Sequence, residues 1–143
     1  MPWSILIVDD SATSRAPIRT HLLAKGAQVI EAESGKEGLW RARTQKIDLI
    51  LTDIHMPVMD GLQMIRELRQ LHAHSTTPIF VATSDASGQR AAEAKAAGAN
   101  GWLVKPADPS LVWMVVENSL RAVPQSPQSA TDSENYRVKG PQK

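Results

Sequence analysis

The fold is decided by a segment near the middle of the chain, Ile47-Asp48-Leu49-Ile50-Leu51-Thr52-Asp53-Ile54-His55-Met56-Pro57. Its apolar run, Leu49 to Leu51, ends just before an acid, and Pro57 then forces a turn. A short apolar run bounded by turn signals is typical of a central strand in a parallel sheet, where both faces are buried. Asp53 is therefore predicted at the carboxyl end of a strand, where open α/β sheets place their ligand crevices.

The same pattern of an apolar run followed by acid occurs at the start of the chain. Residues 5–8 are all apolar, and Asp9 and Asp10 follow them directly. Further strands are predicted at 28–31, 78–83 and 102–104, and helices at 12–25, 34–44, 62–71, 89–97 and 109–121. This alternation predicts an α/β fold, a doubly wound, flavodoxin-like parallel sheet of five strands in the order 2-1-3-4-5 with five helices. The switch point lies between the first and third strands, so Asp9, Asp10 and Asp53 are expected to meet there.

The first predicted helix contains a proline after its opening residues. Pro17 directly precedes Ile18, which begins the apolar period. Proline is tolerated only in the first turn of a helix, because it lacks an N–H and its ring clashes with an earlier carbonyl. We therefore expect the helix either to begin as late as Ser14 or to have a distorted opening turn.

The composition excludes several classes of protein. The chain has 143 residues, enough for one domain plus a remainder, and no cysteine, which excludes disulfides and thiolate metal sites. Lys and Arg number 16 against 15 Asp and Glu, and no basic run indicates a direct nucleic-acid partner. The start has the features of neither a signal peptide nor a membrane span, so a cytoplasmic location is expected.

Residues 123–143 lose the apolar period and are predicted to be a disordered tail or linker after a domain at 1–122.

The side chains predicted at the strand ends suit phosphoryl chemistry. Several carboxylates at one crevice repel one another unless a cation is present, and a few carboxylates with retained water are the usual ligands of Mg²⁺, with Mn²⁺ as a substitute. Thr83 adds a hydroxyl and Lys105 an ammonium at neighbouring strand ends. A carboxylate nucleophile, a metal, a hydroxyl and a lysine are the parts needed to receive a phosphoryl group. The predicted product is an aspartyl phosphate.

These residues carry a resemblance to the receiver domain of two-component response regulators. The matching motifs are Asp9-Asp10, Asp53 with Met56-Pro57 and Met59-Asp60-Gly61 after it, Thr83 followed by a small residue, and Lys105-Pro106. The resemblance covers roughly Trp3 to Arg121. It implies a signalling protein rather than an enzyme, with a sensor histidine kinase or phosphotransfer domain as donor and a downstream protein target.

The resemblance also implies a role for each matching residue. Asp53 would be the phosphoacceptor. Asp10 and Asp53, with the backbone carbonyl of His55, would ligate Mg²⁺, and Asp9 would act mainly through water. Thr83 and Lys105 would hold the phosphoryl oxygens, with the peptide bond after Lys105 in the cis form.

A switch is implied on the same basis. Trp102 falls on the aromatic switch position, which rotates inward as Thr83 moves toward the phosphate, and a tryptophan there is similar to a chemotaxis-type single-domain subgroup. Two departures lie nearby: Ala107 replaces the usual aromatic residue, and Ser84 replaces the common alanine.

Outside this site, the last predicted helix is apolar on two faces. If Val112 and Val116 face the sheet, Trp113 and Met114 point away from it, and we expect them to anchor a partner or a homodimer. A histidine pair in the loop after the third helix, His72 and His74, is interpreted as solvated.

Several alternatives stay open on the sequence alone. The chain is either a complete single-domain regulator or the amino-terminal receiver of a longer protein. A Mg²⁺-dependent phosphohydrolase with an aspartyl nucleophile is disfavoured, because such enzymes generally carry a second acid where this chain has His55. A flavin-binding protein would need a phosphate-binding loop where the chain has Asp9 and Asp10. A receiver that never takes phosphate also fits the fold.

Overall fold

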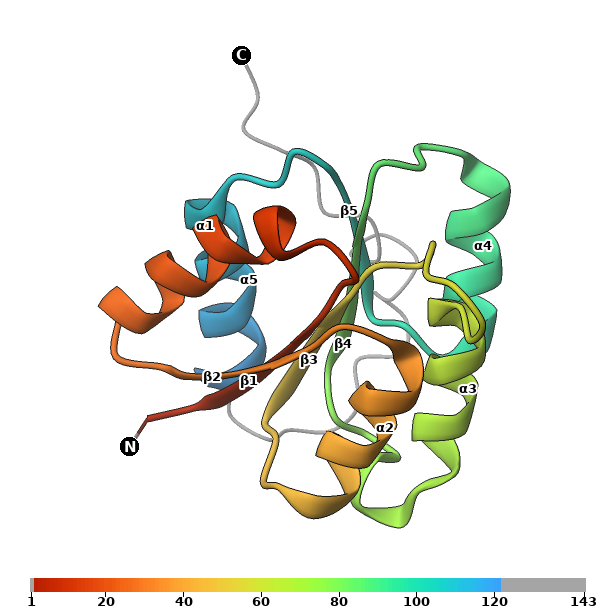
Figure 1. Cartoon of the computed structure of the whole chain (residues 1–143), viewed down its shortest axis with the longest axis horizontal. Helices are drawn as coiled ribbons and strands as arrows, with labels where there is room; N and C mark the ends of the chain where they lie inside the picture. Colours follow the sequence, from red (N-terminus) through yellow and green to blue (C-terminus); the bar gives the residue numbers. More distant parts are fainter. Residues whose placement is uncertain (1, 122–143) are drawn as a thin grey trace.

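The predicted strands form one parallel sheet in a computed structural model that describes residues 2–121 (Figure 1). They are β1 (Ser4–Val8), β2 (Gln28–Ala32), β3 (Leu49–Thr52), β4 (Ile79–Thr83) and β5 (Gly101–Val104). The order is β2-β1-β3-β4-β5, and every neighbouring pair is parallel. The predicted fold class and strand order are confirmed.

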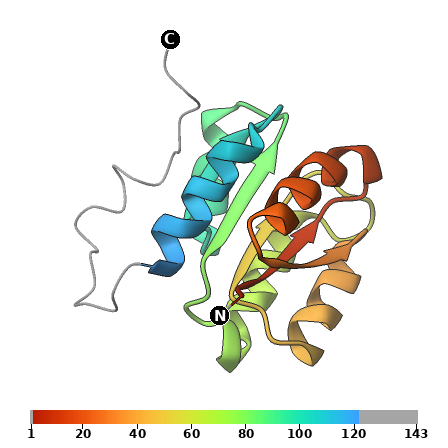
Figure 2. The same ribbon diagram turned by 90° about the vertical axis from the view of Figure 1, so that its left-hand side faces the viewer.

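Helices cover both faces of this sheet. They are α1 (Ala12–Ala24), α2 (Gly35–Thr44), α3 (Gly61–Gln70), α4 (Gly88–Ala97) and α5 (Pro109–Arg121), with a short 3-10 helix η1 (His72–His74). Figures 1 and 2 show α1 and α5 on one face and the other three α-helices on the opposite face. Successive side chains of a strand point to opposite faces, so Leu6 and Val8 pack in the core under α2, α3 and α4, whereas Ile5 and Ile7 pack under α1 and α5.

Short polar side chains begin four of the helices. Ser11, Ser34, Asp60 and Ser87 each accept a hydrogen bond from the backbone N–H three residues later. These caps are visible in the sequence and explain why the predicted helix starts lie close to the observed ones.

The predicted late start of the first helix is wrong. The helix begins at Ala12, and its opening turn is bonded normally, since the backbone N–H of Arg15 donates to the Ser11 carbonyl at 3.2 Å. Pro17 lies inside the helix and removes the donor that the Thr13 carbonyl would otherwise receive. Both residues are exposed, so water can satisfy this carbonyl, while the buried Ile18 and Leu22 hold the helix on the sheet.

The interpretation of His74 as a solvated residue is also wrong. Its side chain is buried in η1, and Nε2 donates to the Ala42 carbonyl of α2 at 2.8 Å. Nδ1 lies 2.9 Å from the Thr77 hydroxyl. His72 is exposed, as predicted. The two histidines differ because only one faces the packed end of α2.

The predicted tail, residues 123–143, lies outside the described part of the chain. Within residues 2–121, no helix is long and apolar enough to cross a membrane.

Candidate phosphoacceptor site

Strand register brings the first two acids together. Val8 pairs with Thr52 across β1 and β3, so the residues that follow, Asp9 and Asp53, emerge side by side from the carboxyl edge of the sheet. The backbone N–H of Asp53 donates to the Val8 carbonyl at 2.9 Å, which extends the ladder to Asp53 itself. Both acids are largely buried.

Lys105 follows the edge strand β5 and reaches these two acids along the carboxyl edge of the sheet. Thr83 pairs with Val104 at the ends of β4 and β5, and the backbone N–H of Lys105 donates to the Thr83 carbonyl at 2.7 Å. The lysine Nζ lies 2.5 Å from Oδ2 of Asp9 and 2.9 Å from Oδ2 of Asp53. One ammonium therefore bridges both carboxylates and offsets part of their negative charge.

The charge state of Lys105 follows from this geometry. Burial alone would lower the pKa of its ammonium, because a charged group loses hydration. The hydrogen bonds and charges of Asp9 and Asp53 outweigh burial and raise the pKa of Lys105 above its ordinary value of 10.5. The lysine is thus held as a cation at neutral pH.

The second oxygen of Asp53 is held by the backbone. Its Oδ1 accepts hydrogen bonds from the N–H groups of Ile54, at 2.6 Å, and His55, at 3.3 Å. Gly61 supports this loop from the start of α3, since its N–H donates to the Ile54 carbonyl at 2.8 Å. A β-carbon at Gly61 would lie only 2.2 Å from the Asp53 carbonyl oxygen. Glycine is required here because the start of α3 touches the backbone of Asp53.

The three carboxylates do not form the expected cluster. Among residues 2–121, no group of three or more Asp, Glu, His or Cys side chains is arranged to hold a metal ion. Asp9 and Asp53 meet through Lys105, whereas Asp10 is exposed, because consecutive side chains leave an extended chain in opposite directions. The donor set nevertheless fits Mg²⁺ chemically. It offers carboxylate oxygens at a place where two carboxylates already share a cation.

Comparison with known proteins identifies the family. The sequence matches the response regulator receiver domain over residues 5–117. The chain belongs to this family. Protein PilH of Pseudomonas aeruginosa is 38% identical over 104 residues, which are 73% of this chain and 86% of PilH. Other curated relatives are longer, and the chain spans between 8% and 50% of their lengths.

Solved receiver structures share the fold of this receiver domain. The chemotaxis response regulator CheY4 of Vibrio cholerae is 34% identical, with a TM-score of 0.79 over 84% of this chain and 100% of CheY4. The receiver domain of the sensor histidine kinase PA1611 from Pseudomonas aeruginosa is 26% identical, with a TM-score of 0.79 over 85% of this chain and 100% of that domain. The PA1611 structure has a magnesium ion coordinated in its active site cleft.

Thr83 and Trp102, the two residues predicted to act as a switch, are both buried. Thr83 is buried, and its hydroxyl accepts a hydrogen bond from the Asp85 N–H at 3.3 Å. Trp102 is 2% exposed and packs with the small residues Ala91 and Ala94 of α4. Its indole Nε1–H has no hydrogen-bond partner among residues 2–121. A buried donor left without a partner costs about 1–3 kcal/mol.

A pair that the sequence analysis missed crosses the mouth of the site. Nε2 of His55 lies 3.0 Å from Oδ2 of Asp85, which links the loop after β3 to the loop after β4. The backbone N–H of Ser87 and the side chain of His55 lower the pKa of Asp85 to about 2. The available signal was its position, since Asp85 follows Thr83 by two residues at the same edge of the sheet.

A pocket of about 390 Å³ lies beside Lys105. Its lining comes from α1 and from the loops after β4 and β5, including Pro17, Ser84, Pro106 and Ala107. The bond between Lys105 and Pro106 is cis, as the family resemblance implied. The two departures from the family pattern, Ser84 and Ala107, thus both line this pocket, where a larger side chain at position 107 would take up space.

The two predicted anchors on α5 differ. Met114 is 49% exposed, as expected for a free apolar face. Trp113 is only partly exposed, because its ring lies 5.7 Å from the ring of Trp3, centroid to centroid. Trp113 is therefore not part of a free apolar face, and its role as an anchor for a partner stays a prediction. The last helix turns this side chain toward the end of α1 rather than away from the domain.

Proposed function

We propose that this receiver domain accepts a phosphoryl group on Asp53 from a histidine kinase or phosphotransfer domain and signals by binding a protein target. The observation that carries the proposal is the double contact of Lys105 Nζ with Asp9 and Asp53, 2.5 and 2.9 Å away, at the carboxyl edge of the sheet. Transfer would form a bond between phosphorus and a carboxylate oxygen of Asp53. It would break the bond from phosphorus to the donor nitrogen.

The residues around Asp53 would offset the charge that arrives with the phosphoryl group. Lys105 is already charged and within reach, and the N–H groups of Ile54 and His55 point at the acceptor carboxylate. Thr83 would supply a hydroxyl from the next strand. Catalysis of phosphoryl transfer is mostly positioning and charge neutralisation, which these groups provide.

Magnesium belongs to this proposal. The carboxylates of Asp10 and Asp53 and the backbone carbonyl of His55 would hold it, with Asp9 acting mainly through water. When bound, Mg²⁺, or Mn²⁺ in its place, supplies positive charge against the phosphoryl oxygens. Lys105 would then leave its contact with Asp9 and turn toward the phosphoryl group.

The output would be a change in the surface around α4, β5 and α5. Thr83 and Trp102 would move together, and the unpaired indole N–H favours a change that gives it a partner. Met114 on α5 and Val104 at the end of β5 are 49% and 46% exposed. We propose that these apolar side chains contact the protein target or a second copy of the chain.

Mass spectrometry of intact protein after treatment with acetyl phosphate and Mg²⁺ tests the phosphorylation. We expect one phosphoryl group, mapped to Asp53 by peptide analysis, and none after chelation of the metal or in Asp53→Asn. Asp108→Asn is the matched control, because Asp108 is an exposed acid whose side chain accepts a hydrogen bond from the Ser110 N–H, a bond that an asparagine oxygen can also accept. No added group, or a group on another residue, would overturn the proposal.

A further inference from the structure

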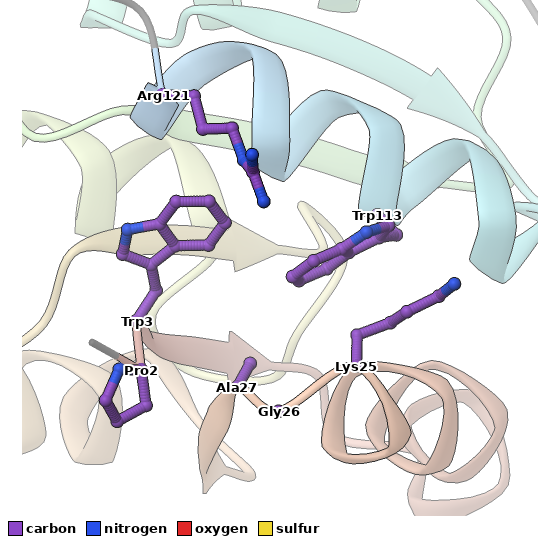
Figure 3. Close-up of a pocket in the computed structure, with 7 residues that line it drawn as sticks. All are labelled: Pro2, Trp3, Lys25, Gly26, Ala27, Trp113 and Arg121. Carbon is purple, nitrogen blue, oxygen red and sulfur yellow. The ribbon is translucent and has the colours of Figure 1, made fainter.

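A second pocket lies at the opposite end of the domain from Asp53. It forms where the end of α1, the start of β1 and α5 come together, and its lining includes Trp3, Lys25, Trp113 and Arg121 (Figure 3). Trp3 directly precedes β1, so this pocket is at the amino end of the sheet, whereas phosphoryl chemistry belongs to the carboxyl end. The receiver function described above does not use it.

Two tryptophan rings make this pocket a surface for apolar groups. The rings of Trp3 and Trp113 are tilted by 42° with centroids 5.7 Å apart, and both side chains are partly exposed. The guanidinium carbon of Arg121 lies 5.6 Å from the Trp3 ring centroid, a cation–π distance. Figure 3 shows Arg121 reaching from α5 toward the space between the two rings, with Lys25 near Trp113 at the end of α1. No acidic side chain lines the pocket within the described chain.

The size of the pocket selects the kind of occupant. Its volume is about 130 Å³, whereas pockets that bury small molecules hold roughly 300–1,000 Å³. The space suits one or two side chains of a peptide, not a nucleotide or another free ligand. Neighbouring aromatic rings are the usual receptor for proline-rich peptides, which bind with little loss of entropy because the polyproline II conformation is already formed.

The sequence itself contains two prolines, spaced Pro-x-x-Pro, shortly after a residue that lines the pocket. Arg121 ends α5 and lines the pocket, and the residues that follow it are Ala122-Val123-Pro124-Gln125-Ser126-Pro127. Three residues span up to about 10 Å, enough for Pro124 to reach a ring that Arg121 already covers. A tether this short gives an effective concentration of roughly millimolar, so even a weak contact is populated.

We propose that the segment Pro124-Gln125-Ser126-Pro127 folds back onto the Trp3 and Trp113 rings of the same chain. The prolines would pack on the indole faces of Trp3 and Trp113. The segment then covers the surface between α1 and α5. A partner that uses Trp113 would first have to displace it.

Nuclear Overhauser spectroscopy of the full chain tests the contact directly. We expect cross-peaks between the ring protons of Pro124 or Pro127 and the indole protons of Trp3 or Trp113. The proline resonances should also be shifted upfield by the indole ring currents. Absence of both signals would overturn the proposal.

Paired variants separate the specific contact from general effects. Trp3→Ala should remove the cross-peaks and return the proline resonances to unstructured positions, with circular dichroism showing that the domain is still folded. Trp40→Ala is the matched control, because Trp40 is a tryptophan on α2, 55% exposed and outside the pocket, and the contact should persist. Proline resonances that stay shifted upfield in both Trp3→Ala and Trp113→Ala would show that the segment binds elsewhere, which contradicts the proposal.

A second copy of the chain is the competing occupant. Mixing chains labelled with ¹³C and unlabelled chains separates contacts within a chain from contacts between chains. We expect all cross-peaks within one chain, independent of concentration. Cross-peaks found only between chains would assign the pocket to a dimer and overturn docking within the chain.

Discussion

Lys105 and Asp53 are 52 positions apart in the chain, and the ammonium nitrogen of the first lies 2.9 Å from a carboxylate oxygen of the second. β4 separates the strands that carry them, so the lysine side chain crosses the end of a whole strand to make this contact. The same nitrogen contacts Asp9 at the end of β1. The ion pair therefore couples three strand ends at the point where we propose that phosphorylation takes place.

Removing the Asp53 charge should lower the pKa of Lys105. Burial would then be opposed only by Asp9, so Asp53→Asn should shift the Nζ titration toward lower pH. Because the folded pKa is raised above 10.5, the stabilisation from this lysine is fully present below pH 10.5 and is lost as the pH rises through the folded value. NMR titration of Nζ measures the shift, and Asp108→Asn is the control. An unchanged midpoint in Asp53→Asn would contradict the assignment of this pair.

Gly61→Ala should damage both stability and phosphorylation. The added β-carbon would lie 2.2 Å from the Asp53 carbonyl oxygen and 2.8 Å from the Ile54 Cα, and these backbone atoms cannot move without shifting the acceptor loop. We expect a loss of about 1–3 kcal/mol in the free energy of unfolding. Urea denaturation and the rate of phosphorylation by acetyl phosphate measure the two effects.

Gly26→Ala is the matched control for Gly61→Ala. A β-carbon at Gly26 meets no atom within 4 Å, but φ is +94°, so we expect a cost of about 1–2 kcal/mol. Phosphorylation should be unaffected, because Gly26 lies at the end of the sheet away from Asp53. A normal phosphorylation rate in Gly61→Ala would show that the close approach to Asp53 does not matter.

Val58 is a strained residue beside the site, and relieving it should stabilise the domain. Its φ is 70°, and its side chain is fully exposed, so packing does not compensate for the conformation. Val58→Asn should increase the free energy of unfolding by about 1 kcal/mol, because asparagine tolerates the left-handed region. Val58→Ala removes the β-branch but has no polar side chain to hydrogen-bond locally in this region, so it should gain less. Thermal denaturation ranks the three proteins, and a destabilised Val58→Asn would argue against the strain.

Arg69→Lys should be costly although the charge is kept. The guanidinium donates to the carbonyls of His74, Thr77 and Gly98 and to the Asn100 side chain, at 2.7 to 3.0 Å. Burial lowers the pKa of Arg69. A lysine cannot donate to these four acceptors from one planar group, so we expect a loss of about 2–4 kcal/mol in the free energy of unfolding, measured by urea denaturation. Arg66→Lys, on the exposed face of the same helix, should change stability by less than about 0.5 kcal/mol. Equal effects of the two substitutions would refute this role.

Much of the fold was predictable from local patterns. The apolar runs that end at Asp9, Asp53 and Thr83 predict buried parallel strands, and the serine and aspartate caps predict where helices begin. Parallel strands place these endings at one edge of the sheet, so the meeting of Asp9, Asp53 and Lys105 at that edge could be predicted. These predictions hold because burial on both faces and helix capping depend on residues close together in the chain.

Local patterns were misleading where a contact between residues far apart in the sequence decided whether a side chain is buried. His74 has the sequence context of a solvated loop, yet it is buried because α2 offers it a carbonyl. Trp113 has the spacing of a free helical face, yet Trp3 covers it from the other end of the chain. Pro17 is tolerated inside α1 because the sheet holds the buried side chains of that helix.

The sequence by itself determined the order of the strands, the acids and the lysine at their ends, and the family to which they belong. Only the tertiary structure decided that Lys105 lies between Asp9 and Asp53, that Asp10 is exposed to solvent, and that a tryptophan-lined pocket forms between α1 and α5. The reason is physical. Periodicity specifies which face of a helix or strand a residue occupies. Which side chain it meets on that face depends on how elements distant in the sequence pack together. Charge pairing and pocket shape depend on that neighbouring side chain.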